Sequence, residues 1–204
     1  MQRSTQRKRA AELLSEHGTT YAKQAGITLT DKPSPLYRLL VLSTLLSTRI
    51  DAQIAVAAAR ELSGATMRTP KRMVDATWQQ RVDALGRGHY RRYDESTATR
   101  LGDGARLLLD TYRGDLRRLR DAADDTAGIL RRLQDFPGIG PTGAAIFARE
   151  AQDVWPALAP CFDTKALDGA RKAGLPEDAD ELDALIDPSD RSRFAAALVR
   201  VALE

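Results

Sequence analysis

The chain has 204 residues, of which 31 are Lys or Arg and 28 are Asp or Glu, so its formal net charge is +3. This length suits one large domain or two small lobes. The shares of apolar residues (43%) and charged residues (29%) are typical of a globular chain and argue against disorder. No apolar run approaches the roughly 20 residues that a membrane helix needs, and the basic start lacks the apolar region of a secretory signal. We expect a cytoplasmic protein with no membrane partner.

Cys161 is the single cysteine, which excludes an intrachain disulfide and a zinc or iron–sulfur site built on cysteines. His17 and His89 are far apart in the sequence, so we expect no side-chain metal site and no required cofactor. Arg far outnumbers Lys, and the basic residues gather in three segments, 2–9, 87–100 and 113–120. This distribution is compatible with a face that binds a polyanion, but charge alone favours the simpler explanation, charges on solvated helix faces.

The hydrophobic periodicity is helical along almost the whole chain. Residues 36–47 are apolar on nearly all sides, which predicts a central buried helix that starts with Ser34 as cap and Pro35 at the first helical position. Further helices are expected at 7–16, 51–62, 71–76, 77–85, 94–111, 128–136, 141–152, 164–173, 177–186 and 190–203, several of them capped by Asp51, Thr69, Thr77 and either Asp125 or Thr126. The only alternating β-branched stretch, at 27–30, is short. The sequence therefore predicts an all-α fold of about ten helices.

One segment stands out, the run from Leu130 to Phe147, in which two apolar helical stretches flank Pro-Gly-Ile-Gly. Gly138 and Gly140 allow positive φ angles, so the chain can reverse within very few residues while Ile139 packs beneath the turn. The backbone amides of 138–143 then point outward at a helix N-terminus, where a phosphate group is favoured. Such a contact reads no base sequence. The alternative is an ordinary corner between two helices whose glycines only cap.

The full pattern, Leu-x-x-Leu-x-x-Phe-Pro-Gly-Ile-Gly-x-x-x-Ala, closely resembles the helix–hairpin–helix element of the endonuclease III superfamily of DNA glycosylases. The resemblance extends from about residue 34 to 203. It implies two helical lobes, with a helix–hairpin–helix motif and a cleft between them. The central lobe would comprise 34–145 and end in the hairpin, and the second lobe would comprise 1–33 and 146–204. The implied DNA-binding residues are Phe136, Gly138, Ile139, Gly140, Thr142, Gly143, Ser47 and Arg49.

The family carries an essential Asp some two dozen residues after its hairpin, and Cys161-Phe162-Asp163-Thr164 looks like that motif. The resemblance makes Asp163 the candidate catalytic carboxylate. Loss of a base from deoxyribose develops cationic charge on the sugar, which a fixed carboxylate stabilises, or the carboxylate positions the attacking water. The alternative is that Asp163 serves only as the N-cap of the helix that follows.

The resemblance also covers two upstream segments. In the segment that ends in Asp51, the family position of Arg49 lies near DNA, so Arg49 would fill the gap left by an extruded base or contact the opposite base; alternatively it is a surface Arg paired with Asp51. The loop 85–93 mixes aromatic residues with arginines, a mixture suited to stacking on bases and holding phosphates. Its candidate pocket residues are His89, Tyr90, Arg91 and Tyr93. Alternatively, the tyrosines pack on the core.

Three departures from the family pattern matter. Bifunctional members carry a lysine where this chain has Thr142, and Thr cannot form an imine with the sugar. Lys165 lies near Asp163 in the sequence, but nothing indicates that it reaches the sugar. The four cysteines of the family's iron–sulfur loop are missing, and the residues after Thr164 depart from the usual pattern. As in the family, main-chain carbonyls of Phe136 and Ile139 are candidates for binding Na⁺ or K⁺.

Together these features predict a DNA repair enzyme, a base-excision DNA N-glycosylase without lyase activity. Its partner would be double-stranded DNA that contains a lesion or a mismatch, and we expect a nucleoid-associated monomer. The rival prediction is a catalytically inactive helix–hairpin–helix module that binds damaged or distorted DNA. Thr142 and the altered residues after Asp163 motivate this rival.

Overall fold

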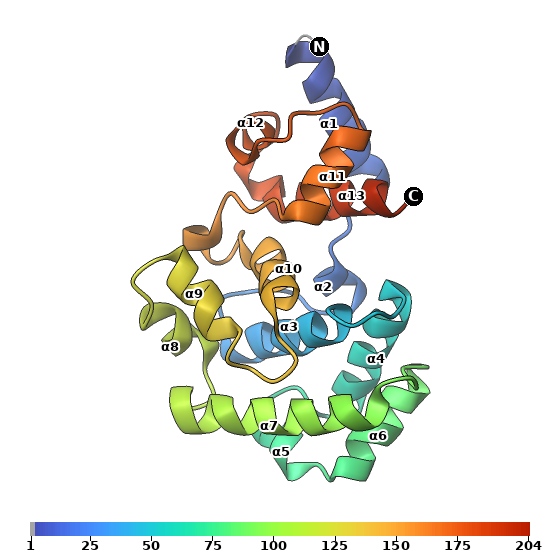
Figure 1. The fold of residues 1–204 in the computed structure, drawn as a ribbon, viewed down its shortest axis with the longest axis vertical. Helices are drawn as coiled ribbons and strands as arrows, with labels where there is room; N and C mark the ends of the chain where they lie inside the picture. Colours follow the sequence, from blue (N-terminus) through green and yellow to red (C-terminus); the bar gives the residue numbers. More distant parts are fainter. Residues whose placement is uncertain (1–2) are drawn as a thin grey trace. The chain divides into compact units, whose positions relative to one another are not determined.

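The computed structural model describes residues 3–204, and within that range every regular element is a helix (Figure 1). The predicted all-α fold is thereby confirmed, and the short β-branched stretch at 27–30 is irregular. The chain divides into two compact units. The central unit comprises Gln24–Phe147, and the terminal unit combines the amino-terminal residues up to Lys23 with Ala148–Glu204. Within 3–204, no helix is both long enough and apolar enough to span a membrane.

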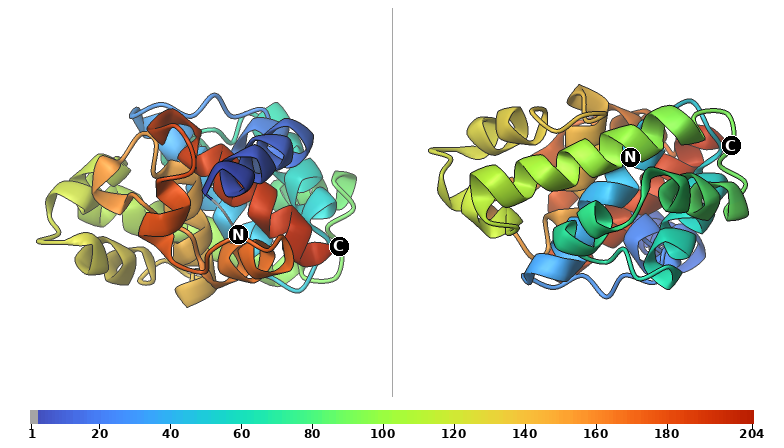
Figure 2. Two further views of the ribbon diagram at one scale, coloured as in Figure 1. Left: turned by 90° about the horizontal axis from the view of Figure 1, so that it is seen from above. Right: turned by 90° about the horizontal axis from the view of Figure 1, so that it is seen from below.

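The helices of the central unit are α3 (Pro33–Leu46), α4 (Ala52–Gly64), α5 (Pro70–Asp75), α6 (Trp78–Arg87), α7 (Asp94–Tyr112), α8 (Leu116–Asp121) and α9 (Thr126–Leu133). The terminal unit contains α1 (Arg3–His17), the short helix η1 (Pro156–Leu158), α11 (Thr164–Lys172), α12 (Ala179–Asp183), η2 (Pro188–Asp190) and α13 (Arg191–Leu203). The division between the units falls within α2 (Tyr21–Gln24) and α10 (Pro141–Ala151). Figure 2 shows the same ribbon from two further directions.

Helix α3 forms the core of the central unit, since nine of its residues are buried, including the unbroken run from Leu39 to Leu45. Its apolar sequence on all sides predicted this position. The helix begins differently from the prediction: Lys32 is the N-cap and Pro33 occupies the first turn. The Ser34 hydroxyl donates to the carbonyl of Arg68 (2.9 Å), so the prediction that Ser34 caps the helix is wrong.

Helix α7 runs along the central unit beside α5 and α6, as Figure 1 and the right-hand view of Figure 2 show. The predicted caps in this unit are confirmed: Asp51, Thr69, Thr77 and Asp125 each accept a hydrogen bond from a backbone amide in the first turn of the helix they precede. Such caps satisfy amides that have no partner inside the helix.

The structure places residues 24–33 with the central unit, whereas the sequence analysis assigned them to the terminal lobe. Ile27 is buried there. Arg38 on α3 donates from its guanidinium to the carbonyl of Gly26 (3.0 Å). This segment is therefore tied to α3 by both apolar burial and a hydrogen bond.

The terminal unit is built on close packing of α11 against α13. A Cβ atom at Gly169 would lie 1.8 Å from the carbonyl oxygen of Leu198, so only glycine permits this approach. Ala10 and Leu13 of α1 are buried in the same unit, as is Phe194 of α13. The Phe194 ring packs edge-on against Phe162, with ring centroids 5.9 Å apart. Because Phe162 directly precedes Asp163, this contact anchors the start of α11.

Candidate functional site

The hairpin between α9 and α10 contains a tight turn at Phe136–Ile139. The amide of Ile139 donates to the carbonyl of Phe136 (2.9 Å), which closes a four-residue turn. Pro137 and Gly138 occupy its two central positions, and Gly138 has a φ of +88°. These are the residues that a type II turn requires, because its third position has a positive φ angle. The side chains of Phe136 and Ile139 are buried and anchor the turn to the core of the protein. These two residues therefore offer only backbone atoms to a ligand.

The turn is braced by neighbouring helices of the central unit. A Cβ atom at Gly138 would lie 3.0 Å from Thr44 of α3 and 3.2 Å from the Cδ atom of Arg100 of α7. The Ser47 hydroxyl, at the end of α3, lies 3.0 Å from the Gly138 carbonyl and donates to it or to the carbonyl of Thr44. Ser47, a predicted DNA-binding residue, thus supports the hairpin from within the protein.

Beyond the turn, α10 begins with a set of unpaired backbone amides. The first amide with an intrahelical partner is that of Ala144, which donates to Gly140 (3.0 Å). Pro141 has no amide hydrogen, and proline is favoured at this first helical position. The amides of Gly140, Thr142 and Gly143 find no acceptor among residues 3–204. Gly140 and Thr142 are exposed, so their amides can reach an external anion.

The two hairpin glycines differ, which corrects the expectation that both adopt positive φ angles. Only Gly138 does so. A Cβ atom at Gly140 would meet nothing within 4 Å, whereas one at Gly143 would lie 3.2 Å from the Ile139 side chain and 3.4 Å from that of Ser47. Gly138 thus serves the turn, Gly143 allows α10 to pack closely on the turn, and Gly140 lies at the open surface.

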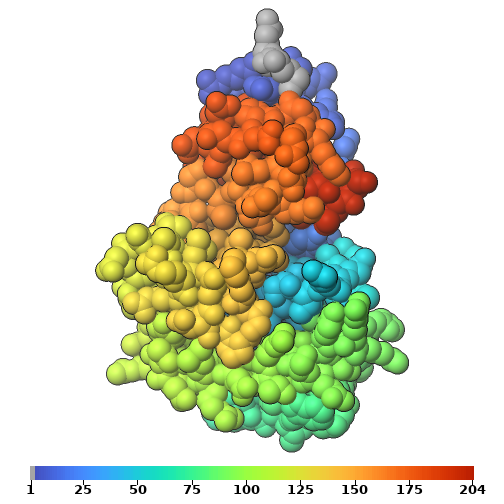
Figure 3. Space-filling model, in the orientation of Figure 1, coloured from blue at the N-terminus to red at the C-terminus, as the bar shows by residue number. Residues whose placement is uncertain are grey.

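Arg49 is exposed in the turn between α3 and α4, and it has no hydrogen bond or ion pair within the described part of the chain. The alternative pairing of Arg49 with Asp51 is absent, because Asp51 caps α4 through the amide of Gln53 (2.7 Å). Figure 3 shows atoms of the hairpin segment (gold) adjoining those of the α3–α4 turn (cyan) and of α7 (green) on one face. Arg49 is thus exposed and free to contact a ligand.

The loop before α7 separates into exposed and buried residues. Tyr90 is fully buried, and its hydroxyl bonds to Thr48 (2.7 Å) and lies within 3.5 Å of the Thr97 hydroxyl. Tyr90 therefore cannot stack on a base, which corrects the prediction for that side chain. His89 and Arg91 are exposed, and the backbone of His89 has a φ of +63°.

Tyr93 is partly exposed and lies beneath a cation: the guanidinium of Arg92 is 5.2 Å from the centre of its ring. Sequence reasoning overlooked Arg100, whose exposed side chain begins against Gly138 and has no ion pair within residues 3–204. Arg100 lies one helical turn before Gly104, where a Cβ atom would be 3.8 Å from Phe136 and Pro137 of the hairpin.

Asp163 is the N-cap of α11, as the alternative interpretation of this residue predicted. Its Oδ1 atom accepts a hydrogen bond from the amide of Ala166 (2.9 Å). Its Oδ2 atom forms an ion pair with Nη1 of Arg149, which is buried on α10. Each carboxylate oxygen has two acceptor positions, so one on each oxygen stays open. The side chain is 12% exposed, so a ligand can reach it.

The loop that leads to Asp163 is also fixed by Gln152, which directly follows α10. Its side-chain amide accepts from the Cys161 amide (2.8 Å) and donates to the Cys161 carbonyl (3.0 Å). Burial raises the pKa of the Cys161 thiol to about 11, so this thiol is uncharged near neutral pH. Lys165 on α11 is exposed.

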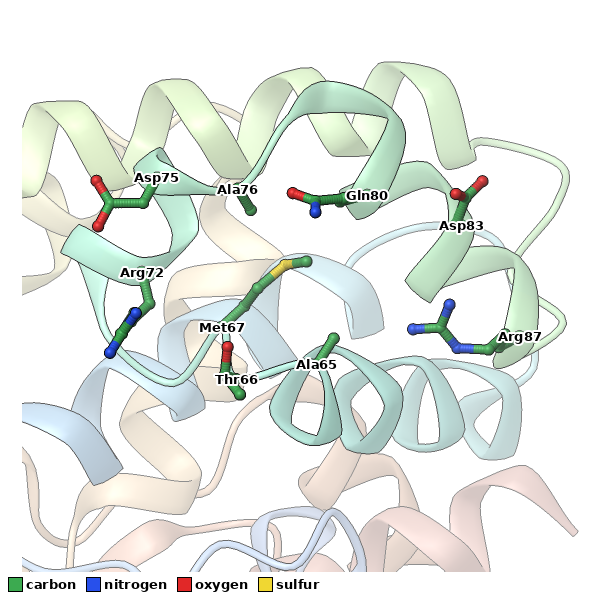
Figure 4. Close-up of a pocket in the computed structure, with 9 residues that line it drawn as sticks. All are labelled: Ala65, Thr66, Met67, Arg72, Asp75, Ala76, Gln80, Asp83 and Arg87. Atoms are coloured by element: carbon green, nitrogen blue, oxygen red, sulfur yellow. The ribbon is translucent and has the colours of Figure 1, made fainter.

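The pocket drawn in Figure 4, with a volume of about 280 Å³, lies among the ends of α4, α5 and α6. It includes none of the predicted site residues. Two of its charged side chains are paired with neighbours outside the pocket lining, Arg87 with Glu61 (2.9 Å) and Asp75 with Lys71 (3.2 Å). This pocket therefore adds nothing to the candidate site.

No group of His, Cys, Asp or Glu side chains within residues 3–204 is arranged to hold a metal ion. The hairpin carbonyls offer a different kind of ligand. Within the same range, the carbonyl of Ile139 accepts no hydrogen bond, and that of Phe136 accepts only the one from Ile139. Carbonyl oxygens of this kind suit hard cations, so both carbonyls fit the predicted role.

No family model matches the sequence, and none of the curated proteins matches it. Solved structures do match. The chain is similar to a trapped endonuclease III–DNA covalent intermediate, an estranged-adenine complex, with 16% identity and a TM-score of 0.53. It is also similar to a non-covalent endonuclease III–DNA complex, with 14% identity and a TM-score of 0.55. Each match covers 98% of this chain and 85% of the other.

At this level of identity, the likeness defines the fold. The class is an all-α protein built around a helix–hairpin–helix motif. More particularly, the chain has the fold of endonuclease III, as the resemblance of its hairpin and Asp163 motifs implied.

Proposed function

We propose that this protein binds double-stranded DNA through its hairpin and excises a damaged or mispaired base as a DNA glycosylase. The observation that carries the proposal is the hairpin itself: a type II turn that leaves exposed, unpaired amides at the start of α10. The two solved structures compared above are complexes of endonuclease III with DNA, which supports the same use of the fold here.

The hairpin would hold the DNA backbone without reading sequence. Phosphate oxygens accept from the exposed amides of Gly140 and Thr142, where the dipole of α10 adds a favourable field. The exposed guanidinium of Arg100, which starts beside the turn, supplies a full positive charge for the same or the next phosphate. Because such contacts release counterions, affinity falls as the salt concentration rises.

Asp163 would support cleavage of the N-glycosidic bond. The bond between C1′ and the base nitrogen breaks, and its electron pair leaves with the base, so the sugar becomes cationic. The open acceptor positions of Asp163 stabilise this cation and orient a water molecule. The water oxygen then bonds to C1′, and its surplus proton is lost to solvent or to the departing base. The products are the free base and an abasic site.

We also propose that the enzyme has no lyase activity. Thr142 occupies the place of the family's Schiff-base lysine, and a hydroxyl cannot form an imine. Lys165 is the nearest amine to Asp163 in the sequence, and borohydride trapping tests it directly. A covalent adduct between protein and DNA that disappears in Lys165→Ala would contradict this part of the proposal.

The decisive experiment measures base release from duplexes that carry uracil, mismatched thymine, oxidised bases or alkylated bases, followed by alkali to cut abasic sites. We expect alkali-dependent nicks on at least one substrate and their loss in Asp163→Asn. Asn caps helices as well as Asp does, so the start of α11 is retained. The matched control is Asp168→Asn, which removes a carboxylate from the same helix at its surface pair with Arg171.

One observation favours the second candidate, an inactive module that binds damaged or distorted DNA. The Asp163 carboxylate is already engaged by Arg149 and by the helix cap, as a purely structural carboxylate would be. Binding to every lesion duplex with no nicks in the whole panel would support this module and refute the enzyme.

We further propose that the carbonyls of Phe136 and Ile139 hold Na⁺ or K⁺ and so stiffen the hairpin. DNA affinity should then be higher in K⁺ or Na⁺ than in tetramethylammonium at equal ionic strength. Equal affinities would contradict a bound monovalent cation.

A further inference from the structure

Three buried polar side chains lie at the end of α10 and directly after it. Arg149, Glu150 and Gln152 are 3%, 2% and 1% exposed, respectively. They bind two different parts of the terminal unit. Glu150 accepts from the amides of Tyr21 and Ala22 (3.3 and 2.9 Å), whereas Arg149 and Gln152 bind the loop that ends in Asp163.

The Asp163 carboxylate is held from two directions. The amide of Ala166 binds Oδ1 along the axis of α11, and Arg149 binds Oδ2 from α10. Gln152 fixes the backbone two residues earlier, at Cys161, and the Phe162 ring packs on Phe194. This carboxylate is therefore restrained in both its backbone and its side-chain torsions.

Arg149 is poorly explained as a residue that merely stabilises the fold. Its Nε atom is buried and has no hydrogen-bond partner within residues 3–204. A buried ion pair is weak support for stability, because desolvation opposes the attraction between the charges. A buried donor without an acceptor adds a further cost. Within residues 3–204, its guanidinium donates one hydrogen bond, from Nη1 to Asp163, and its charge also opposes the effect of burial on the pKa of Glu150.

We infer that Arg149 is the positioning residue of Asp163, an inference that rests on the proposed glycosylase function. Arg149 holds one oxygen of the carboxylate, so that the open acceptor positions keep a fixed direction toward the sugar and the water. A carboxylate that accepts two strong hydrogen bonds is also a weaker nucleophile. Arg149 thus favours stabilisation of the cationic sugar and attack by water over a covalent bond between Asp163 and C1′.

The test measures the single-turnover rate of base release together with the Kd for a duplex that contains an uncleavable abasic analogue. In Arg149→Met, we expect the rate to fall about 10²-fold, as for a misplaced catalytic group, and the Kd to stay within about twofold. Arg149→Lys should restore most of the rate, because the pair uses one nitrogen and a lysine can supply one. The control Arg171→Met removes a surface arginine of α11 and should leave the rate unchanged.

A double variant distinguishes positioning of Asp163 from a purely structural role of Arg149. If Arg149 acts through Asp163, then Arg149→Met lowers the rate in the wild-type background and causes no further loss in an Asp163→Asn background. Should Arg149→Met fail to fold, Arg149→Gln replaces it, since Gln keeps a donor and removes the charge; we expect a rate loss of at least tenfold.

The outcomes distinguish the two levels of the proposal. Failure of the wild-type protein to release any base overturns the glycosylase and this inference with it. Release by the wild type at a rate that folded Arg149→Met or Arg149→Gln fully retains overturns the role of Arg149 alone. Equal losses in Arg149→Lys and Arg149→Met also overturn that role.

Discussion

The geometry at Gly138 allows its substitution to be worked out in numbers. Gly138→Ala places a Cβ on a residue with a φ of +88°, which costs an L-residue about 1–2 kcal/mol. The same Cβ would lie 3.0 Å from the Thr44 methyl group and 3.2 Å from the Arg100 side chain, closer than ordinary van der Waals contact. The end of the Arg100 side chain can move, but Thr44 is buried in α3. We therefore expect a total loss of about 2–3 kcal/mol.

For a chain of this length, such a loss lowers the melting temperature by about 4–12 °C. Two glycines of the central unit provide matched controls. Gly26→Ala meets the same kind of backbone strain at a φ of +69° but no neighbour within 4 Å, so it reports the backbone cost alone. Gly140→Ala meets neither strain nor a neighbour, so its stability should stay within about 0.5 kcal/mol of the wild type.

The assay is thermal unfolding, followed by binding of each folded variant to several unrelated DNA duplexes. Gly138→Ala should weaken binding to all sequences alike, by about tenfold for the loss of one charged hydrogen bond. A loss confined to one sequence would contradict a grip on the backbone. A melting temperature for Gly138→Ala equal to that of Gly140→Ala would refute the packing argument.

Four further predictions follow from single residues. Arg49→Ala should change the free energy of unfolding by no more than about 0.5 kcal/mol. It should slow base release more from a paired site than from an unpaired bubble, because a side chain that fills the gap offsets the cost of unstacking the base. Equal slowing on both substrates would contradict this gap-filling role. Tyr90→Phe removes a buried hydroxyl contact and should lower the melting temperature by about 2–4 °C for a loss of about 1 kcal/mol. The Cys161 thiol, with a pKa of about 11, should react slowly with iodoacetamide in the folded protein and rapidly after unfolding, as mass spectrometry will show. Burial raises the pKa of Glu150 above 4.5, so the folded state binds more protons than the unfolded state, and the free energy of unfolding falls as pH rises above that value. Denaturant titrations at several pH values should show a weaker fall in Glu150→Gln than in the wild type. The same pH dependence in both proteins would argue against Glu150 as the cause.

The helices were predictable because their signals are local. An apolar period of 3.6 residues and a capping side chain both depend only on residues within one or two helical turns, as at Asp51 and Thr77. The error at Ser34 has a tertiary cause: its hydroxyl is bound by the carbonyl of Arg68, which no local rule reveals. The placement of residues 24–33 depends in the same way on Arg38.

The hairpin was predictable for a related reason. Pro137 and Gly138 specify a type II turn in four residues, whatever lies around them. The role of Gly140 was not predictable from the sequence, because a glycine is compatible both with an open surface position and with a strained turn. The burial of Tyr90 also escaped prediction, because an aromatic residue among arginines suits a stacking surface and a core contact equally well.

Asp163 illustrates why the two interpretations of one residue need not exclude each other. A carboxylate that caps a helix is fixed in place by the same hydrogen bond that satisfies the backbone, and a catalytic carboxylate must be fixed in place. The cap uses one acceptor position and Arg149 another, which leaves two open. The helix cap therefore does not argue against catalysis; the argument turns on whether Arg149 restrains Asp163 for chemistry or merely neutralises it. The base-release rate of folded Arg149→Met separates these two possibilities, because an arginine that only neutralises the carboxylate can be removed without slowing base release, whereas a positioning residue cannot.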